Sequence, residues 1–462
     1  MDKSHDSRAE GARDSASTPP LWRLLQEAAG VVGAVRAGAS ATAAIARVDL
    51  NLRSGTQALA FHALRQLGRA EALRHLLARR APPAAPDALL CTALALCWNE
   101  SQAPYEVFTL VDQAVEAAKR DSRTRAQANF INACLRRFVR ERDALVAATA
   151  PEPVARWNHP LWWIERLEKD HPQQWQQILE ANNTQPPMTL RVNARKADPG
   201  QYLSTLRHAD IAASPIGQYG VVLERALPVH LIPGFDSGEV SVQDAAAQLA
   251  APLLLAHAKP APDSQLRVLD ACAAPGGKTA HLLEFADAEV TALDIDPARC
   301  DRIHENLDRL GLQARVLAAD AREPAEWWDG RPFDAILLDA PCTASGIVRR
   351  HPDVRWLRRE SDIAQLAAQQ ARLLAAMWPL LRPGGRLLYC TCSVFRAEGE
   401  VQAQTFVAHN KDAVLRVAPG HLVPHTGAKH NGVRDNLEGD HDGFYYALLE
   451  KRAEDGPARQ GD

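Results

Sequence analysis

Acidic side chains recur in the C-terminal half of the sequence at the points where apolar segments end. Asp270 follows the first of these segments, Asp294 the second, Asp320 the third and Asp339 the fourth. A single aspartate in such a place is usually a turn residue or a helix cap, but four at successive strand ends point to a ligand. An acid after the second strand can accept hydrogen bonds from a ribose, and one after the third can reach an adenine amino group.

A glycine turn adjoins the first of these acids. Residues 267–279 read RVLDACAAPGGKT, which predicts a buried strand, a turn at Gly276 and Gly277, and a helix start. Glycines let the backbone approach a ligand closely. The N–H groups of a helix start attract anionic or carboxylate-bearing ligands, and Lys278 adds positive charge. The turn alone favours an ordinary strand-to-helix connection. It is neither a full G-x-G-x-x-G nor a G-x-x-x-x-G-K-S/T pattern, so NAD and ATP are not the first ligands indicated.

Eight cysteines are spread along the chain without a C-x-x-C pair. This usage argues for reduced thiols in the cytoplasm and against a zinc or other metal site. Cys390 and Cys392 share one side of an extended segment, so spacing alone leaves either as a nucleophile, and a redox role for the pair is a further alternative. Four other cysteines are expected to be buried and to pack as small apolar side chains, which is the common fate of a free cysteine. They are Cys91, Cys97, Cys134 and Cys300.

Alternating strand and helix patterns over residues 241–451 predict a doubly wound, mainly parallel, Rossmann-like α/β domain. Ligands of such sheets bind at the carboxyl ends of the strands. A helix is expected over 361–381, capped by Ser361 and stopped by Pro383, Gly384 and Gly385. Residues 443–449 are expected to form a late edge strand. The other expected strands are 266–269, 290–293, 314–318, 334–338 and 386–390.

The rest of the chain predicts three further parts between two polar tails. Residues 21–150 show helical spacing throughout, 151–186 form a helical connector whose tryptophans pack into a core, and 187–240 form a small α+β module. That module has strands expected at 188–193, 221–223 and 229–232. It has the size of a small RNA-binding sheet, without the aromatic signature of a standard RNA-recognition motif. The tails are residues 1–20, which lack the apolar core of a signal peptide, and 452–462.

Composition indicates a globular protein without a membrane span. The chain has 462 residues, of which 46% are hydrophobic and 24% charged, and its net charge is −3. A nucleic-acid ligand would therefore need local basic patches. One candidate follows Cys342 and is expected to track a phosphate backbone: Arg349, Arg350, Arg355, Arg358 and Arg359. The other, Arg136, Arg137 and Arg140, is either a solvated face of a helical bundle or a surface that binds RNA or protein.

Several motifs resemble those of the RNA 5-methylcytosine methyltransferases. They are CAAPGGKT at 272–279, LLDAPCTASGIVRRHPD at 337–353, TCSV at 391–394 and VQDAAAQ at 242–248. The helical N-terminal region, including INACLRRF, is similar to the NusB-like domain of the RsmB (Sun) branch, which modifies small-subunit (16S) ribosomal RNA. Two departures stand out. Ala133-Cys134 replaces a usual Gly-Val, and the segment after TCS keeps Glu398 but lacks the family's Asn, so it is given no role.

This resemblance implies an S-adenosylmethionine-dependent methyltransferase that acts on carbon 5 of a cytosine. Cys392 would add to carbon 6 of the base, Cys342 would assist removal of the carbon-5 proton and release, and Asp339 would hold or protonate ring nitrogen 3. The enzyme is expected to be a cytoplasmic monomer that binds 16S ribosomal RNA, with the helical domain positioning the RNA. S-adenosylmethionine would contact the carboxylates of Asp294, Asp320 and Asp339 and the backbone of Cys272, Ala273, Ala274, Pro275, Gly276, Gly277 and Lys278.

Two other functions fit part of the pattern. Methylation of another base atom, or of a protein side chain, would not need Cys392. A non-catalytic RNA-binding assembly factor could retain the fold merely to sense the cofactor. The presence of both cysteine motifs, DAPC and TCS, argues against the second alternative.

Overall fold

The computed structural model describes residues 19–260, 264–424 and 440–453. The expected tails, 1–20 and 452–462, lie outside the described residues apart from 19–20 and 452–453. The chain forms two compact units, Met1–Ala150 and Pro151–Asp462.

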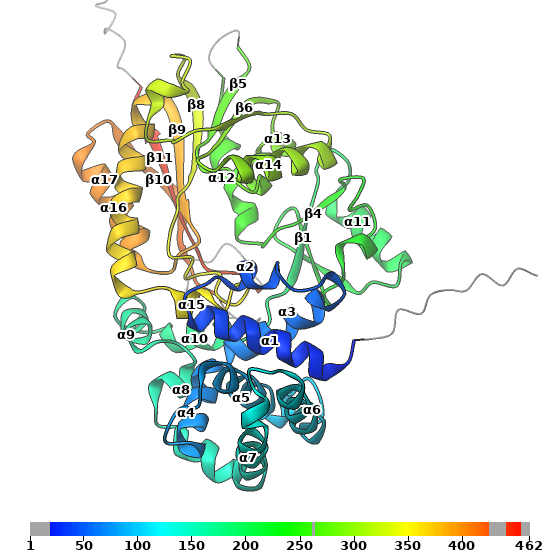
Figure 1. Cartoon of the computed structure of the whole chain (residues 1–462). Coiled ribbons are helices and arrows are strands. Elements are labelled where there is room, and N and C mark those ends of the chain that lie inside the picture. Colours follow the sequence, from blue (N-terminus) through cyan, green and yellow to red (C-terminus); the bar gives the residue numbers. More distant parts are fainter. Residues whose placement is uncertain (1–18, 261–263, 425–439, 454–462) are drawn as a thin grey trace, which may run out of the picture. The chain divides into compact units, whose positions relative to one another are not determined.

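The first unit is all-helical, as the spacing of its apolar residues predicts (Figure 1). Its centre is α5 (Ala84–Cys97), in which every residue from Pro86 to Cys97 is buried. A helix that is apolar on all sides belongs in the interior of a bundle, and the other helices surround it. They are α1 (Leu21–Arg36), α2 (Ala41–Ile45), α3 (Leu50–Arg65), α4 (Leu67–Leu77), α6 (Val107–Arg120) and α7 (Ala128–Thr149).

Three short helices open the second unit: α8 (Pro153–Trp157), α9 (Leu161–Asp170) and α10 (Trp175–Asn182). Trp157 and Trp163 are buried, so the expected core role of these tryptophans is confirmed. They pack in one cluster with Phe395, which follows the TCS motif. His171 adds a contact of 2.7 Å between its Nε2 and the Val394 carbonyl oxygen. The connector therefore supports the segment that carries Cys392.

A four-stranded antiparallel sheet follows, in the order β2-β3-β1-β4. Its elements are β1 (Met188–Val192), α11 (Pro199–His208), β2 (Ala213–Ile216), β3 (Gly220–Leu223) and β4 (Val240–Val242). The prediction of a strand at 229–232 is wrong, because Val229–Leu231 form a short 3-10 helix. Pro228 and Pro233 flank this segment and lack the N–H donors that a paired strand needs.

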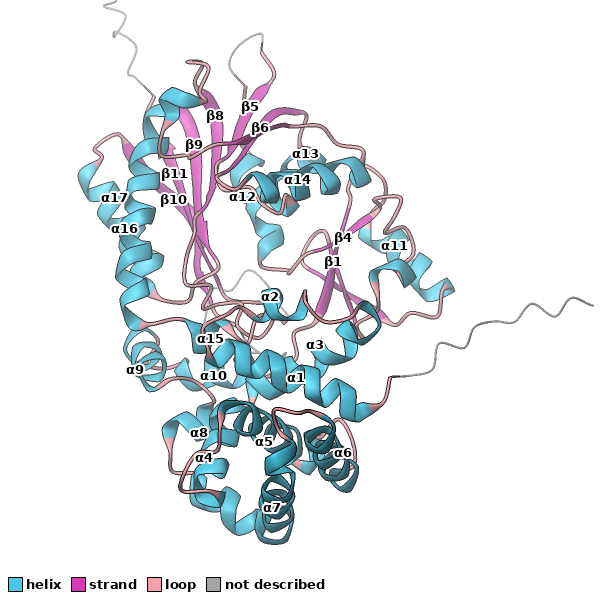
Figure 2. Cartoon of the chain, viewed as in Figure 1, coloured by secondary structure: helices cyan, strands magenta, loops and turns pink. Residues whose placement is uncertain are grey.

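The second sheet has seven strands in the order β10-β11-β9-β8-β5-β6-β7, and the last five in this order are parallel (Figure 2). The predicted Rossmann-like α/β fold is therefore confirmed. Its strands are β5 (Leu266–Asp270), β6 (Ala288–Asp294), β7 (Arg315–Ala318), β8 (Phe333–Asp339), β9 (Leu381–Thr391), β10 (Ala413–Leu422) and β11 (Phe444–Lys451).

Helices cover both faces of this sheet, and each face has its own apolar core. On one face, α12 (Ala250–Leu255), α13 (Gly277–Phe285) and α14 (Pro297–Leu310) pack against Val268, Leu337 and Leu388. On the other, α16 (Glu360–Met377) and α17 (Glu400–His409) pack against Leu269 and Ile336. The short helix α15 (Val354–Leu357) precedes α16.

Three local predictions for this sheet are wrong. The late strand is not an edge, because β11 lies between β9 and the edge strand β10 and pairs antiparallel with both. The helix over 361–381 ends at Met377, and Pro383, Gly384 and Gly385 lie within β9. Ser361 is inside the first turn of α16, which Arg359 caps.

Leu337→Ala tests the central core. Leu337 is fully buried in β8, so the truncation is expected to lower the free energy of unfolding of the second unit by about 2–5 kcal/mol. Urea denaturation of the full chain measures this. The matched control is Leu415→Ala on β10, where the side chain is 50% exposed and the change is expected to stay within about 0.5 kcal/mol. Equal losses in the two variants would contradict this account.

Candidate active site

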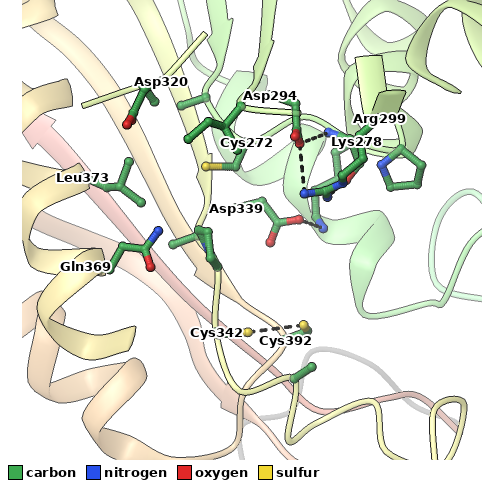
Figure 3. A pocket seen from close by; sticks show the side chains of 18 of the residues that line it. Cys272, Lys278, Asp294, Arg299, Asp320, Asp339, Cys342, Gln369, Leu373 and Cys392 are labelled. Atoms are coloured by element: carbon green, nitrogen blue, oxygen red, sulfur yellow. Dashed lines mark hydrogen bonds and ion pairs between the residues drawn. The ribbon is translucent and has the colours of Figure 1, made fainter. Parts of the chain in front are cut away.

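A cavity of about 440 Å³ opens at the carboxyl end of the seven-stranded sheet (Figure 3). Loops from five parallel strands contribute to it, as expected for this fold. It brings together most of the residues singled out in the sequence: Cys272, Ala274, Pro275, Lys278, Asp294, Asp320, Asp339, Cys342 and Cys392. Ala273, Gly276 and Gly277 are not among the residues that line it.

The glycine turn is shaped by packing within the protein. Gly276 has φ +93°, a left-handed conformation that favours glycine. A Cβ placed there would come within 3.2 Å of the Ile303 Cα on α14. Gly276 is therefore needed for packing against α14, while a Cβ on Gly277 would meet only one protein atom, at 3.9 Å. The close approach of both glycines to a ligand stays a prediction.

Two of the strand-end acids lie apart within the cavity and are held differently (Figure 3). The Asp294 carboxylate accepts the backbone N–H of Ala274 at 3.3 Å and pairs with Arg299 at 3.4 Å. It therefore ties the glycine turn to the end of β6. Asp320 accepts two guanidinium nitrogens of Arg322, at 3.0 and 2.5 Å, and this hydrogen bonding holds the pKa of Asp320 below its ordinary value. Both carboxylates retain acceptor positions for a ligand.

Asp339 lies between a cation and a thiol. Lys278 Nζ donates to one carboxylate oxygen at 2.5 Å, and Cys390 Sγ lies 3.6 Å from the other. Burial is the largest single effect on the pKa of Lys278 and lowers it, but the charge and hydrogen bond of Asp339 and the charges of Cys390 and Cys392 together raise the pKa above its ordinary value. Lys278 therefore carries its charge at the wall of the cavity, where its ammonium group also lies 5.4 Å from the centre of the Phe444 ring.

The sulfur atoms of Cys342 and Cys392 lie 3.4 Å apart (Figure 3). The hydrogen bond to Cys392 and burial raise the pKa of Cys342 well above its ordinary value. The Cys342 thiolate, once formed, is therefore a stronger base than an ordinary thiolate. Cys390, which the spacing left open as a nucleophile, is fully buried, does not line the cavity, and has a pKa raised well above the ordinary value by burial.

Backbone contacts hold the Cys342 loop against its neighbours. Gly346 N–H donates to the Cys392 carbonyl oxygen at 2.9 Å, and Gly443 N–H donates to the Gly346 carbonyl oxygen at 2.9 Å. A Cβ on Gly346 would come within 2.0 Å of the Gly443 oxygen. Only glycine fits where this loop crosses the chain leading into β11.

Asp270 differs from the other three acids because its carboxylate lies beneath the glycine turn. It is fully buried, does not line the cavity, and accepts the Thr279 hydroxyl at 2.7 Å. Burial raises the pKa of Asp270 to about 7.

Several other residues of the cavity carry no signal in the sequence that would mark them as site residues. Gln369 and Leu373 reach it from α16, and Phe444 from β11. The spacing of Gln369 and Leu373 places them on one helix face, but nothing in the sequence indicates that this face meets the cavity. Glu398, left without a role above, is buried and bonds to the residues that follow both cysteines.

Comparison with known proteins agrees with this geometry. Residues 258–450 match the family model of the 16S rRNA methyltransferase RsmB/F, and 159–230 match its ferredoxin-like domain. The ribosomal RNA small subunit methyltransferase B of Pseudomonas syringae pv. tomato is 42% identical over 94% of this chain and 97% of its own length. Its Vibrio cholerae counterpart is 44% identical over 74% of this chain and 76% of its own.

This chain belongs to the RsmB/F family of 16S rRNA methyltransferases. The resemblance read from the motifs is therefore confirmed. The fold is shared as well, because the crystal structure of PH0851 superimposes with a TM-score of 0.69 at 25% identity, covering 92% of this chain and 99% of that one.

The arginines after Cys342 do not form the phosphate track that the sequence predicts. Arg349 and Arg355 are fully buried. Arg349 pairs with Asp440 and Asp442, and Arg355 donates to the Asn182 carbonyl oxygen. Buried charges need such partners, and a run of arginines in a sequence does not reveal whether acids from a distant segment will pair with it.

The other three arginines of this group contribute differently. Arg350 pairs with Asp244 and Asp442, Arg358 donates to the carbonyl oxygens of Cys342 and Thr343, and Arg359 is exposed.

Within residues 19–260, 264–424 and 440–453, every helix is too short or too polar to span a bilayer. In the same ranges, no group of three or more His, Cys, Asp or Glu side chains could hold a metal ion.

Arg349→Ala tests the structural role of the arginines. The substitution removes one of the two arginines that pair with the buried Asp442 and leaves only Arg350. The free energy of unfolding is therefore expected to fall by about 3–5 kcal/mol. Arg359→Ala, at an exposed position, is expected to change it by less than about 0.5 kcal/mol. Urea denaturation measures both. If Arg349→Ala kept wild-type stability but bound RNA more weakly, the result would instead support the prediction that these arginines bind the phosphate backbone.

Asp270→Asn tests the pH dependence of stability. The folded protein binds the Asp270 proton more tightly than the unfolded chain does, so the wild type loses stability as the pH rises from about 4 to about 7. The asparagine amide does not ionise, so its burial costs no stability as the pH rises. The free energy of unfolding of Asp270→Asn, relative to that of the wild type, is therefore expected to increase across this window by up to about 4 kcal/mol. Urea unfolding at pH 5, 6, 7 and 8 measures the difference, and a difference independent of pH would contradict the assignment.

Proposed function

We propose that the protein transfers a methyl group from S-adenosylmethionine to carbon 5 of a cytosine in 16S ribosomal RNA, through a covalent bond to Cys392. The observation that carries the proposal is the 3.4 Å contact between the Cys342 and Cys392 sulfurs in a cavity that also contains three carboxylates. Membership in a family of 16S rRNA methyltransferases supports methyl transfer and the class of RNA.

The residues of the cavity fit S-adenosylmethionine. A volume of about 440 Å³ suits a ligand of this size. Asp294 and Asp320 offer acceptors for ribose hydroxyls and an adenine amino group, while Pro275, Ile295 and Leu373 offer apolar surface. The negative charge of the carboxylates also complements a sulfonium ion. When bound, this cofactor supplies an electrophilic methyl group.

The protein's own task is to activate the base, because carbon 5 of cytosine is a poor nucleophile. A Cys392 thiolate that adds to carbon 6 makes carbon 5 enamine-like and nucleophilic. As negative charge builds at ring nitrogen 3, that nitrogen takes up the proton released by the Cys392 thiol, and the Asp339 carboxylate, with Lys278 beside it, accepts a hydrogen bond from the resulting N–H. Once carbon 5 is methylated, Cys342 acts as a thiolate and takes the carbon-5 proton. The bond between carbon 6 and the Cys392 sulfur then breaks, the sulfur leaves as a thiolate, and nitrogen 3 gives up its proton as the aromatic ring is restored.

Charge along the sequence favours the helical unit as the part that binds RNA. Residues 19–150 contain 17 Lys and Arg against 11 Asp and Glu, whereas 151–462 contain 33 against 41. Lysine and arginine neutralise phosphates and so supply most non-specific affinity for RNA. The arginines next to the cysteines are largely engaged within the protein, which leaves the RNA-binding role to other surfaces, those of the helical unit first.

Three cysteine variants test the mechanism with labelled S-adenosylmethionine and unmodified 16S rRNA. Wild type is expected to form 5-methylcytosine. Cys392→Ala is expected to lose activity by on the order of 10³-fold or more, because the nucleophile is gone. Cys342→Ala is expected to accumulate a protein–RNA adduct, because release fails. Cys390→Ala, two residues from the nucleophile, is the matched control and is expected to stay active.

Each outcome discriminates among the alternatives. Full activity of Cys392→Ala would overturn the covalent mechanism and favour another target atom. Loss of activity in Cys390→Ala alone would transfer the nucleophile to that residue. RNA binding by wild type without any methyl transfer would favour an assembly factor.

A further inference from the structure

Glu398 is a fully buried carboxylate outside the cavity. One of its oxygens accepts the Thr343 backbone N–H at 2.8 Å and the Gln370 side-chain amide at 3.3 Å. The other accepts the hydroxyls of Thr343 at 2.5 Å and Ser393 at 2.6 Å. Four donors therefore converge on one side chain.

The two hydroxyl-bearing partners stand directly after the two cysteines in the chain. Thr343 follows Cys342, and Ser393 follows Cys392. One carboxylate thus bonds to both cysteine segments, which are separated by 50 residues along the sequence. Among the residues that the structure describes, Glu398 is the one side chain that accepts hydrogen bonds from both Thr343 and Ser393.

A second set of contacts fixes Glu398 itself. The Tyr389 hydroxyl lies 2.6 Å from the Glu398 carbonyl oxygen and 3.0 Å from Gln370 Oε1. The Gln370 amide also donates to the Pro341 carbonyl oxygen at 2.9 Å. Since Pro341 immediately precedes Cys342, the network holds the Cys342 segment on both sides.

Burying a carboxylate costs desolvation free energy, so a buried carboxylate with this many partners calls for a functional or structural explanation. Burial raises the pKa of Glu398, and its hydrogen bonds to Ser393, Thr343 and Gln370 oppose that shift. Thiols, by contrast, are weak hydrogen-bonding groups that cannot fix their own separation. The positions of the two sulfurs therefore depend on the backbone segments that carry them.

We propose that Glu398 is a positioning residue for methyl transfer, which holds the Cys342 and Cys392 segments so that both sulfurs face one base. This inference rests on the proposed function. The negative charge of Glu398 is also among the effects that raise the pKa of Cys342, after the hydrogen bond to Cys392, burial and the charge of Cys392.

The test compares Glu398→Ala and Glu398→Gln in the full chain. A displacement of about 1 Å at reacting groups costs on the order of 100-fold in rate. Glu398→Ala is therefore expected to lower kcat about 100-fold with the KM values for S-adenosylmethionine and RNA unchanged. Glu398→Gln keeps the shape and one acceptor, so it is expected to recover about tenfold of that loss, which leaves its kcat about tenfold below that of the wild type and its cross-linking slower.

A second readout needs neither cofactor nor RNA. Diamide, a two-electron thiol oxidant, is expected to join Cys342 to Cys392 rapidly in wild type, because a disulfide requires close sulfurs. Mass spectrometry of the linked peptides measures the rate, which is expected to fall about tenfold in Glu398→Ala. The matched control is Asp334→Asn, a buried carboxylate that accepts from Arg382 and from the Arg267 backbone. It is expected to keep wild-type kcat and cross-linking.

The two proposals fail in different ways. Wild-type kcat and cross-linking in both Glu398 variants would overturn the positioning role. A raised KM with kcat unchanged, or equal losses in Asp334→Asn, would do the same by indicating a general effect on the fold. If Glu398→Ala does not fold, Glu398→Gln alone decides by the same two measurements. Slower cross-linking in a protein whose wild type forms no 5-methylcytosine would instead overturn the proposed function.

Discussion

The parallel pairing of β8 with β9 is the constraint on which the rest of the site depends. In this register Asp339 lies opposite Cys390, so the loops that leave the two strands start side by side. Cys342 comes three residues after the first position and Cys392 two residues after the second. Both sulfurs are therefore brought to one point by backbone hydrogen bonds within the sheet, and the same bonds keep Cys390 in the core, where its thiol is inert.

Charge around this point is balanced locally. Lys278 is paired with Asp339, Asp294 with Arg299, and Arg349 with two aspartates near β11. In a medium of low polarity each pair is stable only with good geometry and further hydrogen bonds. The cations next to the cysteines therefore serve first to hold the shape of the loops.

The parts that could be predicted from sequence are those in which a local pattern determines the structure. Central parallel strands are buried on both faces and appear as continuous apolar runs, so β5, β6 and β8 were predictable. Strand β10 was missed because most of its residues are partly exposed and Pro419 and Gly420 interrupt it. The cysteines and strand-end acids were recognisable by motif. The burial of Arg349 and the role of Glu398 were not, because their partners lie 91–93 and 55 residues away.

The position of β11 in the sheet determines when during synthesis the sheet can be completed. This strand is the last described element, yet it inserts between β9 and β10, and Gly443 just before it packs against Gly346 in the Cys342 loop. While the chain is still being translated, β9 has only one of its two neighbours and the loop lacks its support. The backbone contact between Gly346 and Gly443 can therefore form only after residues 443–451 have been synthesised, so the Cys342 loop gains this support later than it gains the pairing of β8 with β9.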